Sequence, residues 1–129
     1  MPKTEALASA KVLLVDDEEE IRWAISHFLT AKGFSVEVAA NFNEGLKLAE
    51  SHTFSLIISD FKMPGGNGLD LFRQVRSLNP NPPKFILISG DDNISAVDQQ
   101  EIGIFRVFGK PFAIKELVEA VKEALLHTS

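Results

Sequence analysis

Short apolar runs and amphipathic stretches alternate five times along this chain of 129 residues. The apolar runs are rich in branched side chains, which is typical of buried strands. They lie at residues 11–15, 34–38, 54–59, 85–88 and 104–108. A regular alternation of strands and helices predicts an α/β fold with a mostly parallel sheet and helices on both of its faces.

The stretches between these runs carry apolar residues at helical spacing. The clearest apolar stripe belongs to the first helix and comprises Ile21, Ala24, Ile25, Phe28 and Leu29. Gly33 is expected to end this helix. The second helix is expected to begin at Asn41 or Asn43, either of which can cap it. Further helices are expected over 69–78, 92–101 and 114–125.

The first helix also begins with three glutamates, at positions 18–20. The helix dipole favours negative charge in the first turn of a helix. We therefore interpret Glu18, Glu19 and Glu20 as residues that stabilise the helix and not as functional residues.

The most hydrophobic runs, at 11–15, 54–59 and 85–88, are expected at the centre of the sheet. The run at 34–38 alternates between apolar and polar residues and is expected at an edge. Because no repeat or linker interrupts the pattern, we expect one domain over residues 11–127, preceded by a flexible arm over residues 1–10.

Composition excludes several classes of function. The chain has a net charge of −5 and no basic run, which argues against direct binding of nucleic acid. It contains no cysteine, which excludes disulfides and thiolate metal sites. No apolar run approaches the roughly 18 residues that span a bilayer, and no signal peptide is present. We therefore expect no membrane association and a cytoplasmic location.

Polar residues stand at the carboxyl ends of four predicted strands. They are Asp16 and Asp17 after the first, Asp60 after the third, Ser89 after the fourth and Lys110 after the fifth. The carboxyl ends of parallel strands share one edge of the sheet, where ligands bind in such folds. We therefore expect these side chains to converge.

The chemistry of this set favours phosphoryl transfer. Two carboxylates ~4 Å apart repel by about 4 kcal/mol at an effective dielectric constant of 20, so three of them require a cation. Ligation by oxygen atoms alone suits Mg²⁺. Asp60 is the candidate nucleophile because a glycine-rich loop follows it and leaves the approach open. Asp16 and Asp17 are better placed to hold the metal, while Lys110 and Ser89 can bind phosphoryl oxygens.

The chain closely resembles the receiver domains of bacterial two-component response regulators. The resemblance covers about residues 11 to 127 and keeps the order and spacing of the family's motifs. These are Val12-Leu13-Leu14-Val15-Asp16-Asp17, Asp60-Phe61-Lys62-Met63-Pro64 with Gly68 and Asp70, Ile88-Ser89-Gly90 and Lys110-Pro111-Phe112. The resemblance implies a flavodoxin-like, doubly wound, five-stranded parallel sheet in the order 2-1-3-4-5 with five helices.

The resemblance also implies a phosphoacceptor function. Asp60 would take a phosphoryl group from the phosphohistidine of a histidine kinase or of a histidine phosphotransfer protein. Asp16 and Asp17 would position Mg²⁺, and Asp60 and the backbone carbonyl of Lys62 would complete its protein ligands. The chain would catalyse only its own phosphoryl uptake and hydrolysis, so we do not expect an enzyme that acts on other substrates.

Lys110 would contact the phosphoryl oxygens, with a cis peptide bond to Pro111, and Ser89 would move toward the phosphate. This would switch a face built from the last two helices and the fifth strand, where a downstream protein binds. The family commonly has an aromatic residue three positions before the lysine, and here that residue is Val107. Either the aromatic switch is absent or Phe105 takes its place.

Lys62 has two interpretations of its own. Its side chain is either a solvated lysine that pairs with Asp91 or a group that reaches over the site and alters the lifetime of the phosphate. Two alternative functions also remain open. One is a Mg²⁺-dependent phosphohydrolase that uses Asp60 on small phosphate esters, and the other is a pseudo-receiver that binds partners without ever carrying phosphate.

Overall fold

The computed structural model describes residues 10–90 and 104–126. Five strands form one parallel sheet in the order β2-β1-β3-β4-β5. The strands are β1 (Lys11–Val15), β2 (Ser35–Ala39), β3 (Leu56–Asp60), β4 (Lys84–Ser89) and β5 (Ile104–Gly109). This confirms the predicted fold class, the strand order and the central position of β1, β3 and β4.

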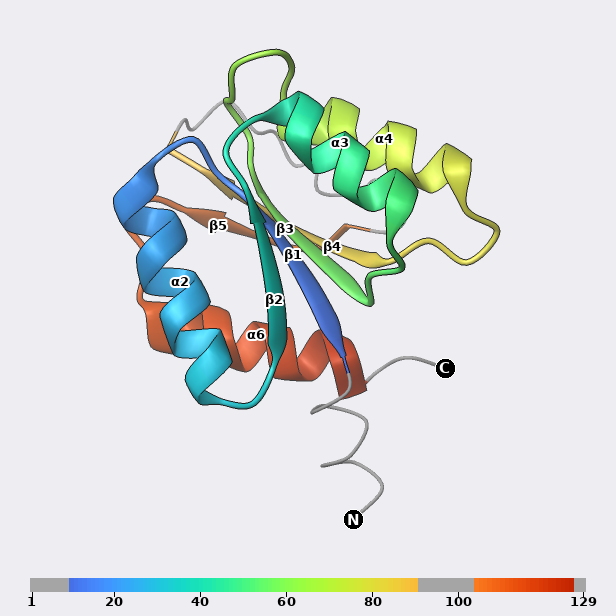
Figure 1. Ribbon diagram of the computed structural model, residues 1–129. Coiled ribbons are helices and arrows are strands. Elements are labelled where there is room, and N and C mark those ends of the chain that lie inside the picture. The colour runs from blue at the N-terminus through green and yellow to red at the C-terminus, as the bar shows by residue number, and fades with distance from the viewer. Residues whose placement is uncertain (1–9, 91–103, 127–129) are drawn as a thin grey trace.

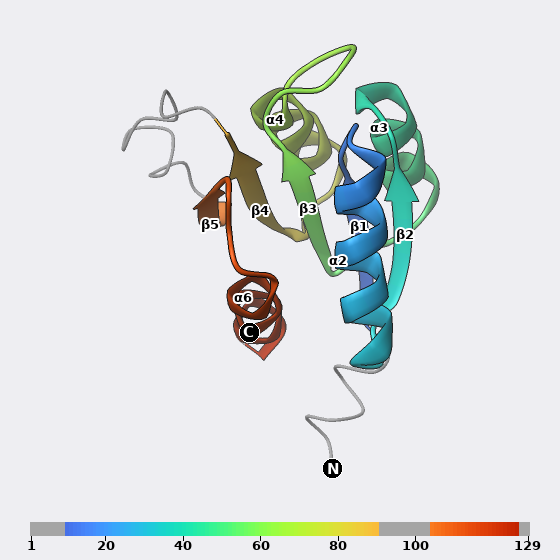
Figure 2. The ribbon, with the colours of Figure 1, turned by 90° about the vertical axis from the view of Figure 1, so that its left-hand side faces the viewer.

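Helices cover both faces of the sheet. The described helices are α2 (Glu19–Ala31), α3 (Phe42–Ser51), α4 (Gly68–Leu78) and α6 (Ile114–Leu126). Helices α2 and α6 lie on one face, and α3 and α4 lie on the other (Figure 1). All neighbouring strands pair in parallel, and Figure 2 shows the arrowheads of β2, β3 and β4 pointing the same way, so the carboxyl ends of the strands lie at the same edge. The predicted helix over 92–101 and the predicted arm over 1–10, apart from residue 10, lie outside the described residues.

Alternate residues of the central strands build two separate hydrophobic layers. Val12 and Leu14 of β1 pack toward α2 and α6, whereas Leu13 and Val15 pack toward α3 and α4. All four side chains are fully buried. Burying both faces in this way explains why β1 reads as a continuous apolar run.

The helix boundaries agree with most of the expected signals. Gly33 has a positive φ of 96° after α2, a conformation that glycine adopts without steric cost. Asn41, and not Asn43, caps α3 through a hydrogen bond from Glu44 N. Phe28 departs from the expected stripe of α2, because its side chain is 46% exposed while Ile25 and Leu29 are buried. None of the helices within 10–90 and 104–126 is long and apolar enough to cross a membrane.

One irregularity changes the expected pattern of β5. Phe85 pairs with Ile104, but the next residue of β4, Ile86, pairs with Arg106, so Phe105 is an extra residue in the ladder. This bulge places Phe105 with the layer under α6, together with Phe108. Val107 packs into the opposite layer. Phe105 therefore does not share a face with Val107, and the proposal that it substitutes for an aromatic residue at position 107 is wrong for this structure.

Candidate functional site

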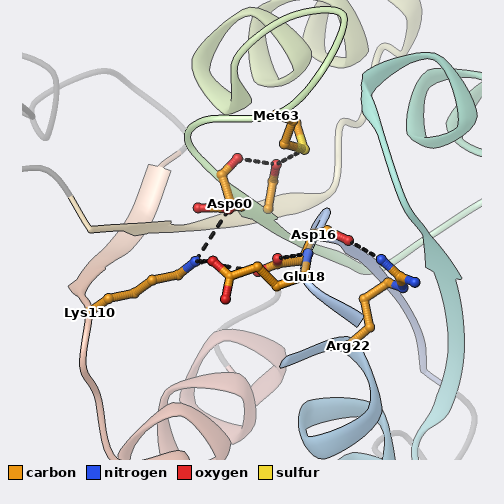
Figure 3. A network of polar contacts seen from close by, with 7 residues as sticks. Asp16, Glu18, Arg22, Asp60, Met63 and Lys110 are labelled. Atoms are coloured by element: carbon orange, nitrogen blue, oxygen red, sulfur yellow. Dashed lines mark hydrogen bonds and ion pairs between the residues drawn. The ribbon is translucent and has the colours of Figure 1, made fainter. Parts of the chain in front are cut away.

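Three of the predicted strand ends meet at one point of the sheet edge. Asp16 follows β1, Asp60 ends β3 and Lys110 follows β5, and their side chains point toward one another (Figure 3). Lys110 Nζ lies 3.3 Å from Asp60 Oδ2 and 3.9 Å from Asp16 Oδ2. Asp60 is 5% exposed and Asp16 is fully buried, so this is an ionic cluster largely shielded from water.

Backbone hydrogen bonds fix the loop that carries Asp16. Asp16 N donates to Ala39 O across the sheet at 3.1 Å. Asp16 Oδ1 accepts a hydrogen bond from Glu18 N at 2.8 Å, and Arg22 Nη1 donates to Asp16 O at 2.7 Å. These contacts use the backbone and one carboxylate oxygen of Asp16, and they leave Oδ2 directed into the site.

Backbone hydrogen bonds also fix the loop after Asp60. Phe61 N donates to Ile88 O, and Gly68 N donates to Phe61 O, both at 2.7 Å. A Cβ atom at Gly68 would lie 2.5 Å from the carbonyl oxygen of Asp60, so only glycine fits there. The close return of the chain at Gly68 therefore helps to set the position of Asp60.

Lys110 is positioned by the neighbouring strand. Its backbone N–H donates to Ser89 O at 2.8 Å. The peptide bond between Lys110 and Pro111 is cis, as predicted. Ser89, the last residue of β4, is 5% exposed and adjoins Lys110 through this hydrogen bond. Lys62 lies in the loop after β3 with an exposed side chain, and its predicted partner Asp91 falls outside the described residues.

Glu18 belongs to the site, which corrects its interpretation as a helix-stabilising residue. Its Oε1 atom lies 3.0 Å from Lys110 Nζ, and its side chain forms no capping hydrogen bond. Glu19 and Glu20 do stand in the first turn of α2, in agreement with the prediction. The signal that could have identified Glu18 is its place directly after Asp16 and Asp17, in the loop that the first strand delivers to the sheet edge.

The carboxylates fit a divalent cation. Asp16, Asp17, Glu18 and Asp60 each offer one oxygen atom, and these atoms lie within 4.8 Å of one another. Among the described residues, Asp16 Oδ2 is a buried side-chain oxygen without a hydrogen-bond partner. An unpartnered buried carboxylate oxygen is costly unless a cation binds it. An all-oxygen set with this geometry suits Mg²⁺.

The cluster perturbs the pKa of each buried group in it. Burial and, to a lesser extent, the charge of Asp16 raise the pKa of Asp60 to about 6, although Lys110 opposes the shift. Burial also raises the pKa of Asp16, and the hydrogen bond from Glu18 N opposes this. Burial alone would lower the pKa of Lys110, but the hydrogen bond with Glu18 and the charges of Asp16 and Asp60 raise it overall. Lys110 therefore remains an ammonium ion.

Comparison with known proteins agrees with the fold and the site geometry described above. Residues 12–122 match the model of the family described as the response regulator receiver domain. The regulator NtrC of Salmonella typhimurium, a DNA-binding transcriptional regulator, is 35% identical over 116 residues. That match covers 90% of this chain and 25% of NtrC. This chain thus spans about a quarter of the length of that relative.

Two solved structures extend the likeness to three dimensions. A CheY-like receiver domain from Methanospirillum hungatei has a TM-score of 0.83 and 31% identity, covering 90% of this chain and 93% of that one. The response regulator TrrA from Thermotoga maritima, in complex with Mg²⁺ and BeF, has a TM-score of 0.79 and 30% identity. That match covers 89% of this chain and 98% of TrrA.

Proposed function

The chain belongs to the family of response regulator receiver domains, and on this premise we propose that Asp60 is its phosphoacceptor. The observation that carries the proposal is the contact of Asp60 Oδ2 with Lys110 Nζ at 3.3 Å, inside a cluster of carboxylates at the sheet edge. A buried carboxylate beside a fixed ammonium group has a nucleophilic oxygen and a partner for the phosphoryl oxygens.

The donor is the phosphohistidine of a histidine kinase or of a histidine phosphotransfer protein. An oxygen atom of Asp60 attacks phosphorus, the bond between phosphorus and the histidine nitrogen breaks, and its electron pair stays on that nitrogen. Lys110 donates hydrogen bonds to the phosphoryl oxygens, and the Ser89 hydroxyl donates another. Asp60 reacts as the carboxylate, which predominates above its pKa of about 6.

We assign the metal site to four groups. Asp16, Asp17 and Asp60 supply carboxylate oxygens, and Lys62 supplies its backbone carbonyl. The unpartnered Asp16 Oδ2 supports this assignment, as does the Mg²⁺ in the related TrrA structure. A bound Mg²⁺ would spread the charge of the transferring phosphoryl group. The chain's own residues hold the nucleophile at the end of β3 and exclude most water from it.

A groove beside the site suits the docking of the phosphodonor. It has a volume of about 640 Å³ and runs from Lys110 to α2. Its lining is mainly apolar and includes Ile21, Ala24 and Phe112. We propose that the protein carrying the phosphohistidine covers this groove, which would place its imidazole ring near Asp60.

Phosphorylation would act on a downstream protein through Ser89 and the face built from the last two helices and β5. The phosphoryl group adds about −2 charge and three strong acceptors beside Ser89 and Lys110. Because Ser89 ends β4 and Lys110 follows β5, a shift of either residue would be transmitted to that face. We propose that the chain acts only on its own phosphoryl group. We place the receiver domain at residues 11–127 and the protein in the cytoplasm.

Intact-mass measurement after incubation with acetyl phosphate and Mg²⁺ tests this function. We expect one phosphoryl group on the wild-type protein and none on the Asp60→Asn variant. Rapid multiple turnover of p-nitrophenyl phosphate would instead identify a phosphohydrolase. A wild-type protein that takes up no phosphoryl group would identify a pseudo-receiver.

A further inference from the structure

Glu18 lies in the site, but the phosphoryl transfer described above gives it no role. Its Oε1 atom is 3.0 Å from Lys110 Nζ, whereas Asp60 Oδ2 is 3.3 Å away from the same nitrogen. Lys110 is therefore closer to Glu18 than to the phosphoacceptor. The two residues are 92 positions apart in the sequence, so the contact depends on the fold.

We propose that Glu18 is a positioning residue that acts through Lys110. In the unphosphorylated protein, Glu18 holds the ammonium group at the mouth of the site. Lys110 must move away from Glu18 before its ammonium group can fully stabilise the oxygens of an incoming phosphoryl group. This inference rests on the proposed function, because it concerns the reaction at Asp60.

The exposure of the Glu18 and Lys110 side chains supports a role for Glu18 in holding Lys110. The side chain of Lys110 is 18% exposed, and that of Glu18 is 55% exposed. Asp16 Oδ2, which is directed into the site, has no hydrogen-bond partner, while the Glu18 carboxylate accepts a hydrogen bond from Lys110 Nζ. Glu18 thus faces the rim of the site and binds the lysine, and we do not assign it to the metal.

The expected effect is slower phosphoryl uptake in the wild-type protein than in a variant without this charge. Negative charge spreads over the phosphoryl oxygens in the transition state, and Lys110 must stabilise it. Glu18 competes for that ammonium group, and its own charge opposes the approach of an anionic donor. Hydrolysis changes less, because Lys110 contacts the phosphoryl group both before and during that step.

Glu18→Gln removes the charge without disturbing the backbone. The hydrogen bond from residue 18 N to Asp16 Oδ1 remains, and no capping bond is lost, since the side chain forms none. Glu19→Gln is the matched control, because it removes the same charge one position later in the first turn of α2. Both changes affect exposed side chains, so both variants should fold.

The first measurement is the rate of phosphoryl uptake from acetyl phosphate at saturating Mg²⁺. We expect Glu18→Gln to increase it about threefold to fivefold, as for the loss of a partly exposed ion pair. Glu19→Gln should react at close to the wild-type rate. Equal rates for the two variants would overturn the inference while leaving the proposed function intact. A loss of Mg²⁺ affinity confined to Glu18→Gln would also overturn it, because Glu18 would then be a metal ligand.

The second measurement does not depend on phosphorylation. Nuclear magnetic resonance of the Lys110 ammonium group in the metal-free protein reports how fast its hydrogens exchange with water. Glu18→Gln should accelerate this exchange, and Glu19→Gln should not. Unchanged exchange in Glu18→Gln would overturn the inference even if the uptake rate rose. If the wild-type protein took up no phosphoryl group, the proposed function would fail, and this exchange measurement would still decide whether Glu18 holds Lys110.

Discussion

Replacing Asp60 by asparagine should stabilise the metal-free protein at neutral pH. Asp60 is 5% exposed, and burial together with the charge of Asp16 raises its pKa to about 6. Asparagine has almost the same shape as aspartate and carries no charge. The variant therefore removes an unfavourable buried charge and keeps the packing at the end of β3.

The size of this effect follows from the geometry of the site. The shift from 3.8 to about 6 is roughly two pKa units, which correspond to about 3 kcal/mol of folding free energy. The carboxylate oxygens lie within 4.8 Å of one another. At this distance, two charges repel by about 3.5 kcal/mol at an effective dielectric constant of 20. The pKa shift already includes the opposing effect of Lys110, so we expect Asp60→Asn to gain about 2–3 kcal/mol.

The pH dependence has a definite sign. Below the unfolded-state pKa of 3.8, Asp60 is protonated in both states and the wild-type protein has no penalty. As pH rises toward the folded-state pKa of about 6, the unfolded chain loses its proton first and the wild-type protein becomes less stable. Above that value the penalty is complete. The advantage of Asp60→Asn should therefore grow from about pH 4 to about pH 6 and then stay constant.

Urea denaturation in the presence of a chelator measures this difference. The free energy of unfolding should be higher for Asp60→Asn at pH 7.5, and nearly equal for the two proteins near pH 4. Glu19→Gln is the control for loss of one exposed charge and should change stability by less than about 0.5 kcal/mol. An Asp60→Asn variant that is no more stable than the wild type at pH 7.5 would refute the assignment of Asp60 to a buried, repulsive cluster.

Three further substitutions test how the site and its supports are built, each by urea or thermal denaturation. Gly68→Ala would place a Cβ atom 2.5 Å from the Asp60 carbonyl oxygen, so we expect a loss of about 1–3 kcal/mol and slower phosphoryl uptake. Asn41→Ala removes the capping bond from Glu44 N at 2.9 Å and should cost about 1 kcal/mol, with unchanged uptake. Leu71→Ala empties a fully buried position of α4 and should cost about 2–5 kcal/mol. If the denaturation midpoint of any of these variants equalled that of the wild-type protein, the contact on which that prediction rests would not stabilise the fold as described.

The sequence was sufficient to predict the sheet and most of the site. Asp16 follows β1, Asp60 ends β3 and Lys110 follows β5, and the rule that parallel strands end at one edge brings them together. The position of Glu18 could not be decided in this way, because an acidic residue before a helix fits a dipole role equally well. Only the three-dimensional position of Lys110 distinguishes the two roles.

The remaining discrepancies also have physical causes. An apolar pattern does not reveal a bulge, so the sequence left open that Phe105 replaces the missing aromatic residue, whereas the extra residue in β5 puts Phe105 on the face opposite Val107. Helical spacing identified the apolar face of α2, but it does not show how much of that face the rest of the fold covers. Phe28 lies outside the covered part and is therefore half exposed. Both errors concern the extent of tertiary packing, which a local pattern does not contain.

The most direct test of the central claim is to locate the phosphoryl group by tandem mass spectrometry after reaction with acetyl phosphate. If the sheet-edge cluster is the phosphoacceptor site, the group should be found on Asp60, and chelation of Mg²⁺ should prevent its appearance. Labelling of another residue, or labelling of Asp60 that is the same with and without the chelator, would contradict the account.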